Sequence, residues 1–198
     1  MKNHFYSFAL AVALFVTTSC SSDDQSANTS PVPFAEENPW LGLLAETDLG
    51  QTTLVFIDDN NYYDMGMAFI PTVKGQINSF VVKLPESHNN IRISLWDRTT
   101  AEILRTEYID VLVANTDTKL EILPLQLQKD KEYVVAITSD DYYMLFQENG
   151  SAVTYPVSVG NITVTGGTDQ LANAQQMPEF YTANAISGIV SFNFQQTE

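Results

Sequence analysis

The segment Ile186–Gln195, ISGIVSFNFQ, decides the fold class. Apolar residues and glycine alternate in it with mostly polar ones: the first set is Ile186, Gly188, Val190, Phe192 and Phe194. Successive side chains of a β-strand point to opposite faces, so a period of two predicts a strand with one buried face. The end of the chain is therefore expected to be a half-buried strand.

The same type of pattern recurs along the chain, in runs rich in β-branched and aromatic residues separated by turn residues. We expect further strands at Thr52–Ile57, Asp64–Ile70, Gln76–Leu84, Asn90–Asp97, Ile103–Val111, Lys119–Leu127, Tyr133–Ser139, Tyr142–Gln147 and Asn161–Thr165. About ten strands with short connections predict an all-β fold, an antiparallel β-sandwich of jelly-roll type. Helix is expected only in two short pieces, one from Pro39 to Leu44 with Asn38 as its cap and one over Gln170–Gln176.

These strands belong to a single expected domain, residues 34–198, because the length of the processed chain suits one domain, and the sequence has no internal repeat. The segment before it, residues 20–33, is acidic and rich in Ser, Asn and Pro, with almost nothing to bury. Such a composition predicts a flexible tether. The domain is long enough to bury a core of its own.

The start of the chain has the order of an exported lipoprotein signal. Lys2 precedes the apolar run Phe5–Val16, which is shorter than the about 20 residues that span a bilayer. Two small residues then stand directly before Cys20, the only cysteine. This order resembles the lipobox of bacterial lipoproteins, although the usual leucine is absent, and implies removal of residues 1–19 and fatty acylation (palmitate) of Cys20. An ordinary secretory signal with an incidental cysteine is the alternative.

The acidic stretch Ser21–Gln25 resembles the export tag of Bacteroidetes surface lipoproteins, with a flexible acidic spacer as the alternative. Serine rather than aspartate after Cys20 agrees with delivery to the outer membrane. Stable attachment requires two acyl anchors or more, each buried CH₂ contributing about 0.8 kcal/mol. We therefore expect a lipid-anchored protein of the outer membrane, exposed at the cell surface.

The charge of the processed chain excludes one class of partner. Removal of residues 1–19 leaves 179 of the 198 residues, and the loss of Lys2 takes the net charge from −15 to −16. Nucleic-acid binding depends on neutralising phosphates with Lys and Arg, so nucleic acid is not an expected partner. Because Cys20 would carry lipid, no disulfide can form within the processed chain.

Catalytic patterns are absent from the sequence. After removal of the signal, His88 is the only histidine, and we interpret it as a surface residue in a hairpin loop. No Gly-x-Ser-x-Gly elbow accompanies it. The doublets Asp58-Asp59 and Asp140-Asp141 offer carboxylates for glycoside hydrolysis, but neighbours on a strand point to opposite faces and Asp favours turns. We expect no catalytic residue and no cofactor.

Carboxylates could also hold a structural calcium ion. Asp58 and Asp59 with Asp64 supply oxygen ligands of the kind that Ca²⁺ takes. They lack the spacing and the glycine of an EF-hand loop, so a plain acidic loop is the alternative.

Aromatic side chains give the main indication of a binding role, because flat rings stack on sugar faces. On Asn90–Asp97, the phase of the strand puts Trp96 on the face opposite the core residues. It would lie there either exposed or under a neighbouring loop. By the same phase argument Tyr62 and Tyr143 are the more outward members of their tyrosine pairs; for each, the alternative is a buried ring with its hydroxyl at the surface. These three rings are the predicted ligand-binding residues.

Several short motifs, in order, carry a family resemblance: Tyr63–Phe69, Lys74–Phe80, Ser94–Asp97, Ile103-Leu104, Leu123-Pro124 and Tyr133–Val135. They resemble the bacterial domain of unknown function 4082, over roughly Asp64–Phe194. That family is a β-sandwich accessory to secreted and carbohydrate-active proteins, and the resemblance implies such a role here. The chain departs from the family at Asp130-Lys131, where glycine is usual, and at Gly188–Phe192, where the family tends to have Trp and Asp.

The sequence thus predicts a non-enzymatic, lipid-anchored β-sandwich that binds an extracellular ligand, with a glycan as the first expectation. The alternatives are a structural or assembly role in an outer-membrane complex, with an unidentified protein partner, and a glycoside hydrolase. The assembly role would require a contiguous exposed apolar patch. The hydrolase would require two carboxyl groups converging in one cleft.

Overall fold

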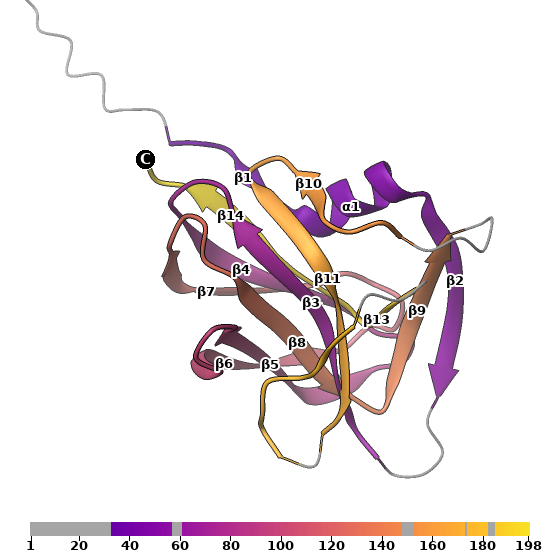
Figure 1. The fold of residues 1–198 in the computed structure, drawn as a ribbon. Helices are drawn as coiled ribbons and strands as arrows, with labels where there is room; N and C mark the ends of the chain where they lie inside the picture. The colour runs from indigo at the N-terminus through magenta and orange to yellow at the C-terminus, as the bar shows by residue number, and fades with distance from the viewer. Residues whose placement is uncertain (1–32, 57–60, 148–152, 173, 182–184) are drawn as a thin grey trace, which may run out of the picture. The chain divides into compact units, whose positions relative to one another are not determined.

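The computed structural model describes residues 33–56, 61–147, 153–172, 174–181 and 185–198 (Figure 1). The elements in chain order are β1 (Glu36–Glu37), α1 (Pro39–Thr47), β2 (Leu49–Phe56), β3 (Tyr63–Pro71), β4 (Gly75–Lys83), β5 (His88–Asp97), β6 (Glu102–Val111), β7 (Thr118–Leu127), β8 (Tyr133–Ser139), β9 (Asp141–Gln147), β10 (Val157–Val159), β11 (Ile162–Leu171), β12 (Phe180–Tyr181), β13 (Ala185–Ser187) and β14 (Ile189–Gln196). Each of the ten strands expected from the sequence has a counterpart here. In the described ranges, no helix is long and apolar enough to cross a membrane.

The strands form a β-sandwich of antiparallel sheets. One sheet has the order β1-β14-β4-β7, a second has the order β10-β11-β3-β8-β5-β6 with β12 added on β11, and a third has the order β13-β9-β2. Residues from all three sheets share one core cluster, and Phe69 of β3 meets Phe192 of β14 with ring centroids 4.4 Å apart. The all-β sandwich is therefore confirmed, while the jelly-roll type stays a prediction.

The final segment is not one half-buried strand, as its alternation suggested. Gly188, at φ +76°, separates β13 from β14 and donates its N–H to the carbonyl of Tyr143 over 2.9 Å. The chain thereby passes from the three-stranded sheet to the four-stranded one. The expected outward residue Ser191 is also buried, and its hydroxyl donates to Asn38 at the start of α1. The helix covers the face that was expected to be exposed.

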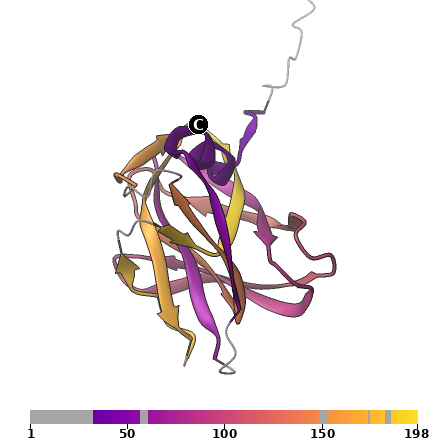
Figure 2. The same ribbon diagram turned by 90° about the vertical axis from the view of Figure 1, so that its right-hand side faces the viewer.

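The two expected helical pieces have different outcomes. Asn38 caps α1, and its Oδ1 accepts the N–H of Trp40 over 3.0 Å, as the sequence predicts. The helix continues to Thr47, beyond the expected end at Leu44. The second helix is wrong: Gln170 and Leu171 complete β11, which pairs with β3 along its full length. α1 lies across one end of the strands (Figure 2).

An ion pair joins the last residue of β5, Asp97, to Lys131 in the turn before β8, and it is expected to make stability depend on pH. Asp97 is buried, its carboxylate accepts the N–H of Thr99, and Lys131 Nζ lies 2.7 Å from it. The hydrogen bond from Lys131 lowers the pKa of the Asp97 carboxyl below its ordinary value, against the opposing effect of burial. A carboxyl whose pKa is lower in the folded state stabilises above its unfolded pKa of about 3.9, and this stabilisation disappears as pH falls through the folded pKa.

Substitution of Lys131 by methionine is expected to lower stability at pH 7 more than at pH 3, because it removes the partner that favours the charged carboxylate. The measurement is the urea midpoint at both pH values. Lys129→Met is the matched control, since Lys129 is exposed and 4.0 Å from the exposed Asp130. Equal losses at pH 7 and pH 3 would show that the pair does not carry this pH dependence.

Candidate functional site

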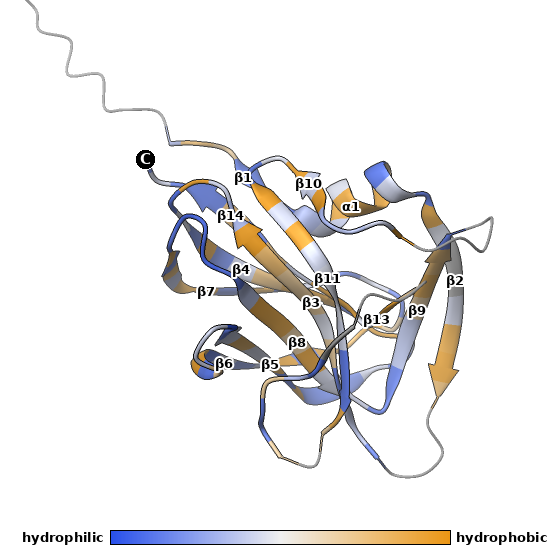
Figure 3. Cartoon of the chain, in the orientation of Figure 1, coloured by the Kyte–Doolittle hydropathy of each residue, from blue (hydrophilic) through white to orange (hydrophobic). Residues whose placement is uncertain are grey.

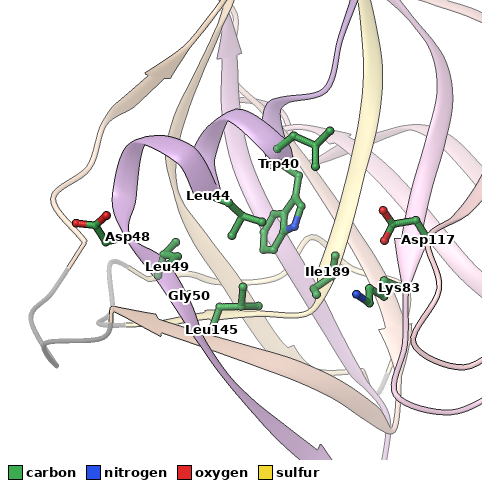
Figure 4. A pocket seen from close by; sticks show the side chains of 10 residues that line it. Trp40, Leu44, Asp48, Leu49, Gly50, Lys83, Asp117, Leu145 and Ile189 are labelled. Atoms are coloured by element: carbon green, nitrogen blue, oxygen red, sulfur yellow. The ribbon is translucent and has the colours of Figure 1, made fainter.

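A partly open pocket of about 810 Å³ lies beside α1 (Figure 4). Its lining comes from four parts of the chain: α1 with its junction to β2, the end of β4 with the start of β14, the loop before β7, and β9. The lining residues are Trp40, Leu41, Leu44, Asp48, Leu49, Gly50, Lys83, Asp117, Leu145 and Ile189. The helix cap positions the first of them, because Asn38 fixes the start of the turn that carries Trp40.

The pocket combines an apolar wall with three charged groups. Figure 4 shows the indole of Trp40 pointing from α1 toward Leu145 and Ile189, with Lys83 and Asp117 on one side. Asp48 lies on the opposite side. Lys83 and Ile189 are cross-strand partners in β4 and β14, so the sheet register fixes this part of the wall. Such a site can bury apolar ligand surface while ammonium and carboxylate groups bond polar substituents.

Tyr143 is buried and does not lie on the surface. Its side chain is buried, 6% exposed, and its hydroxyl donates to Asn115 Oδ1 in the loop before β7. Lys83 Nζ lies 5.8 Å from the ring centroid. Burial, together with the negative charge of Asp141, raises the pKa of the Tyr143 phenol above its ordinary value. Tyr143 is therefore not the more exposed of the two tyrosines, and its ring is buried, as in the alternative that the sequence left open, with its hydroxyl bonded to the loop that contains Asn115.

Trp96 lies on the predicted face but is fully buried. It forms a small cluster with Ala68, Val134 and Ala136, separate from the main core, and Met177 packs against this cluster. Nearby, the Gln175 amide donates to Ser94 Oγ over 3.1 Å. The segment before β12 thus covers this sheet face, which is the covered alternative that the sequence left open. Trp96 offers no ring face to solvent.

Tyr62 is the one predicted ring that lies exposed, at 48%. It stands just before β3, and its carbonyl accepts the N–H of Ala172. It does not line the pocket. The β2 residues that line the pocket are the first two of that strand, whereas Tyr62 follows the end of β2 in the chain. The three predicted rings therefore do not form one platform.

The predicted calcium ligands are only in part within the described residues. Asp58 and Asp59 lie outside them, as does the predicted lipidation residue, Cys20. Asp64 is described and buried, and Arg92 Nη2 lies 3.1 Å from its Oδ1. Thr138 donates its hydroxyl to the same oxygen. The Asp64 carboxylate thus already has a cation and a hydroxyl donor.

His88 is not the loop residue that the sequence suggested. It is the first residue of β5, its side chain is 21% exposed, and its Nε2 lies 2.8 Å from Asp141 Oδ1. Ser139 Oγ donates to the same Oδ1 over 2.9 Å. A Ser-His-Asp triad requires the imidazole between hydroxyl and carboxylate, whereas here the carboxylate lies between the other two. The arrangement is not a nucleophilic triad.

Sequence reasoning missed Trp40, Lys83 and Asp117 as site residues. The capping signal at Asn38 placed Trp40 in a helix, but no local pattern brings that helix to the ends of β4 and β9. Lys83 follows an apolar strand and Asp117 lies in a polar loop, which are ordinary positions for charged residues. The pocket is a product of tertiary structure.

Comparison with known proteins does not assign the chain to a family, because no family model and no curated protein matches it. The resemblance to the domain of unknown function 4082 therefore stays a prediction.

Proposed function

We propose that this protein is a non-catalytic binding module, held at the outer membrane through acylated Cys20, that takes an extracellular saccharide in the pocket beside α1. The observation that carries the proposal is the pocket itself, about 810 Å³, with an apolar wall and charged groups on two sides. This volume is within the range of small-ligand sites, about 300–1,000 Å³. The anchor rests on the sequence pattern around Cys20.

A saccharide suits this lining for two reasons. Its C–H faces are apolar and can lie against Leu145, Ile189 and the indole edge of Trp40. Trp40 as a whole is 7% exposed. Its hydroxyl groups are donors and acceptors, so they can bond the Lys83 ammonium and the Asp117 carboxylate together. The net charge of −15 disfavours a polyanionic ligand.

Non-catalytic binding is supported by the surroundings of the titratable groups. Asp48 follows the helix as its cap in the left-handed conformation, and its carbonyl accepts the N–H of Gly50. Lys83 lies over the buried Tyr143 ring. These contacts hold the groups in place for binding. Two carboxylates, Asp48 and Asp117, line the pocket from opposite sides, so the hydrolase alternative is tested by assaying any bound saccharide for cleavage.

Loss of the Lys83 ammonium is expected to weaken saccharide binding by about 10-fold or more, because a hydrogen bond to a charged group contributes about 1.5–3 kcal/mol. Lys83→Met keeps the aliphatic stem against Tyr143, and Asp117→Asn keeps the shape of its side chain. A glycan array with the full-length protein selects the ligand, and isothermal titration then compares the variants.

Glu121→Gln, on the exposed part of β7, is the matched control and is expected to bind as the wild type does. The proposal is wrong if the wild type binds no saccharide. It is also wrong if both pocket variants, shown to be folded by circular dichroism, retain wild-type affinity.

An assembly role in an outer-membrane complex is the second candidate, and one observation favours it. β2 is the last strand of its sheet in the described residues, and its end is coloured hydrophobic in Figure 3. Leu54 and Phe56 on this strand are exposed. Exposed apolar edge strands can pair with a strand of another chain. Cross-linking in intact cells separates the two roles, because only assembly requires a fixed protein neighbour.

A further inference from the structure

Three metal-ligating side chains converge where β5 and β9 begin. His88 begins β5, Asp140 lies between β8 and β9, and Asp141 begins β9. One ligand atom from each, an imidazole nitrogen or a carboxylate oxygen, lies within 4.8 Å of the others. Because Asp140 precedes the strand, the two aspartates do not point to opposite faces as a strand would require. None of the three lines the pocket.

Two buried polar atoms in this cluster have no hydrogen bond. His88 Nε2 and Asp140 Oδ1 are both inaccessible to solvent, and neither has a hydrogen-bond partner in the described part of the chain. Nε2 has an ion-pair partner, Asp141 Oδ1 at 2.8 Å, so Asp140 Oδ1 is the buried atom of the cluster that lacks a partner in the described residues. An unpaired buried polar atom costs about 1–3 kcal/mol, and an ion or a water molecule bound at Asp140 Oδ1 would remove that cost.

Hydrogen bonds from neighbouring residues fix the orientation of the Asp141 carboxylate. Asp141 is buried, Ser139 Oγ donates to its Oδ1 over 2.9 Å, and the N–H of Glu86 donates to its Oδ2 over 3.0 Å. Metal-ligating carboxylates are typically oriented by hydrogen bonds of this kind. The His88 side chain is 21% exposed, but its Nε2 faces Asp141 and is inaccessible to solvent.

We propose that His88, Asp140 and Asp141 bind a divalent transition-metal ion of the zinc class. Zn²⁺ takes imidazole nitrogen and carboxylate oxygen at about 2.0–2.2 Å, with water at an open position. Ligands at that distance from one ion are about 3–4 Å apart, so these atoms, which lie within 4.8 Å of one another, have to move closer together to share it. Imidazole is a ligand for zinc-class ions, whereas Ca²⁺ takes oxygen ligands. The ion joins the seven-stranded sheet to the three-stranded one through β5 and β9.

The test is titration of the full-length, untagged protein with ZnCl₂ by isothermal calorimetry. Cys20→Ser is present in every sample, because a free thiol is itself a zinc ligand. We expect one Zn²⁺ per chain and much weaker binding of CaCl₂. His88→Ala and Asp140→Asn are each expected to lower zinc affinity about 100-fold or more, since even outer partners of a metal site contribute 10–100-fold.

Asp130→Asn is the matched control, because Asp130 is an exposed aspartate. Its backbone is left-handed, a conformation that asparagine also tolerates. Zinc is expected to raise the thermal midpoint of the wild type and this control, and not that of Asp140→Asn. If His88→Ala fails to fold, Asp140→Asn decides, since it keeps the size of the side chain. The proposal is overturned if the wild type takes up no zinc or if folded Asp140→Asn keeps wild-type affinity. Either result leaves the pocket proposal standing, because the two sites share no residue.

Discussion

Alanine at position 66 is expected to destabilise the domain by about 3 kcal/mol or more, the upper range for an overpacked core. Gly66 lies in β3, between β11 and β8, and pairs with Thr168 and Ala136. A Cβ at this position would lie 2.0 Å from the Val135 carbonyl oxygen and 2.8 Å from the Ala136 Cα. Both atoms belong to the backbone of the next strand, so no side-chain rotation can relieve the contact.

Urea unfolding followed by far-UV circular dichroism measures the loss. Gly42→Ala is the comparison, because its Cβ would meet the side-chain Cγ1 of Val159, which can rotate. Alanine in a helix is also about 1 kcal/mol more favourable than glycine. The free energy of unfolding of a native protein is typically about 5–15 kcal/mol, so a loss of about 3 kcal/mol is a large part of it. Losses of equal size in the two variants would show that the strand backbone moves apart easily.

The positions of the strands could be predicted because each carries its signal locally. The expected runs Gln76–Leu84 and Asn90–Asp97, for example, correspond to β4 and β5 with ends displaced by at most two residues. The short strands β1, β10 and β12 were missed, since two or three residues carry no recognisable period. Gln170 and Leu171 were assigned to a helix because nothing local reports that β11 pairs with all of β3.

The exposure of the aromatic residues could be predicted only in part. Strand phase correctly separated Trp96 from the core side chains of β5, because alternation is a property of the strand itself. What covers the outer face depends on a distant segment, here the one that contains Met177. Tyr143 is likewise covered by the loop at Asn115. The alternation along a strand therefore predicts on which face of the sheet a side chain lies, but not whether that face is exposed to solvent.

His88 shows the same limit for chemical sites. Its polar surroundings in the sequence, Glu86–Asn90, are typical of a surface turn. Its partners Asp140 and Asp141 follow β8, and β8 is the antiparallel neighbour of β5. Only the sheet order, which the sequence did not provide, brings the two aspartates to the start of β5.

Replacement of Asp64 by alanine is the second change with a large expected effect, a loss of about 3 kcal/mol. Asp64, Thr138 and Arg92 are cross-strand partners on β3, β8 and β5. The Asp64 side chain is 3% exposed, and its two oxygens lie 3.1 and 3.4 Å from Arg92 Nη2. Its removal leaves a largely buried guanidinium without its carboxylate. The loss is expected at the low end of the range for broken buried pairs because the Arg92 side chain is 21% exposed.

A double-mutant cycle isolates the contribution of the pair. Arg92→Met removes the cation beside the buried Asp64 carboxylate and leaves it the hydrogen bond from the Thr138 hydroxyl, so a comparable loss is expected. The double variant leaves no unpaired charge, so it should lose about 1–3 kcal/mol less than the sum of the single changes. Glu198→Ala, which breaks the exposed pair with Lys74, is the control and should change stability by less than about 1 kcal/mol. Additive losses at Asp64 and Arg92 would mean that each residue stabilises the sheet independently, through packing and not through the charge of its partner.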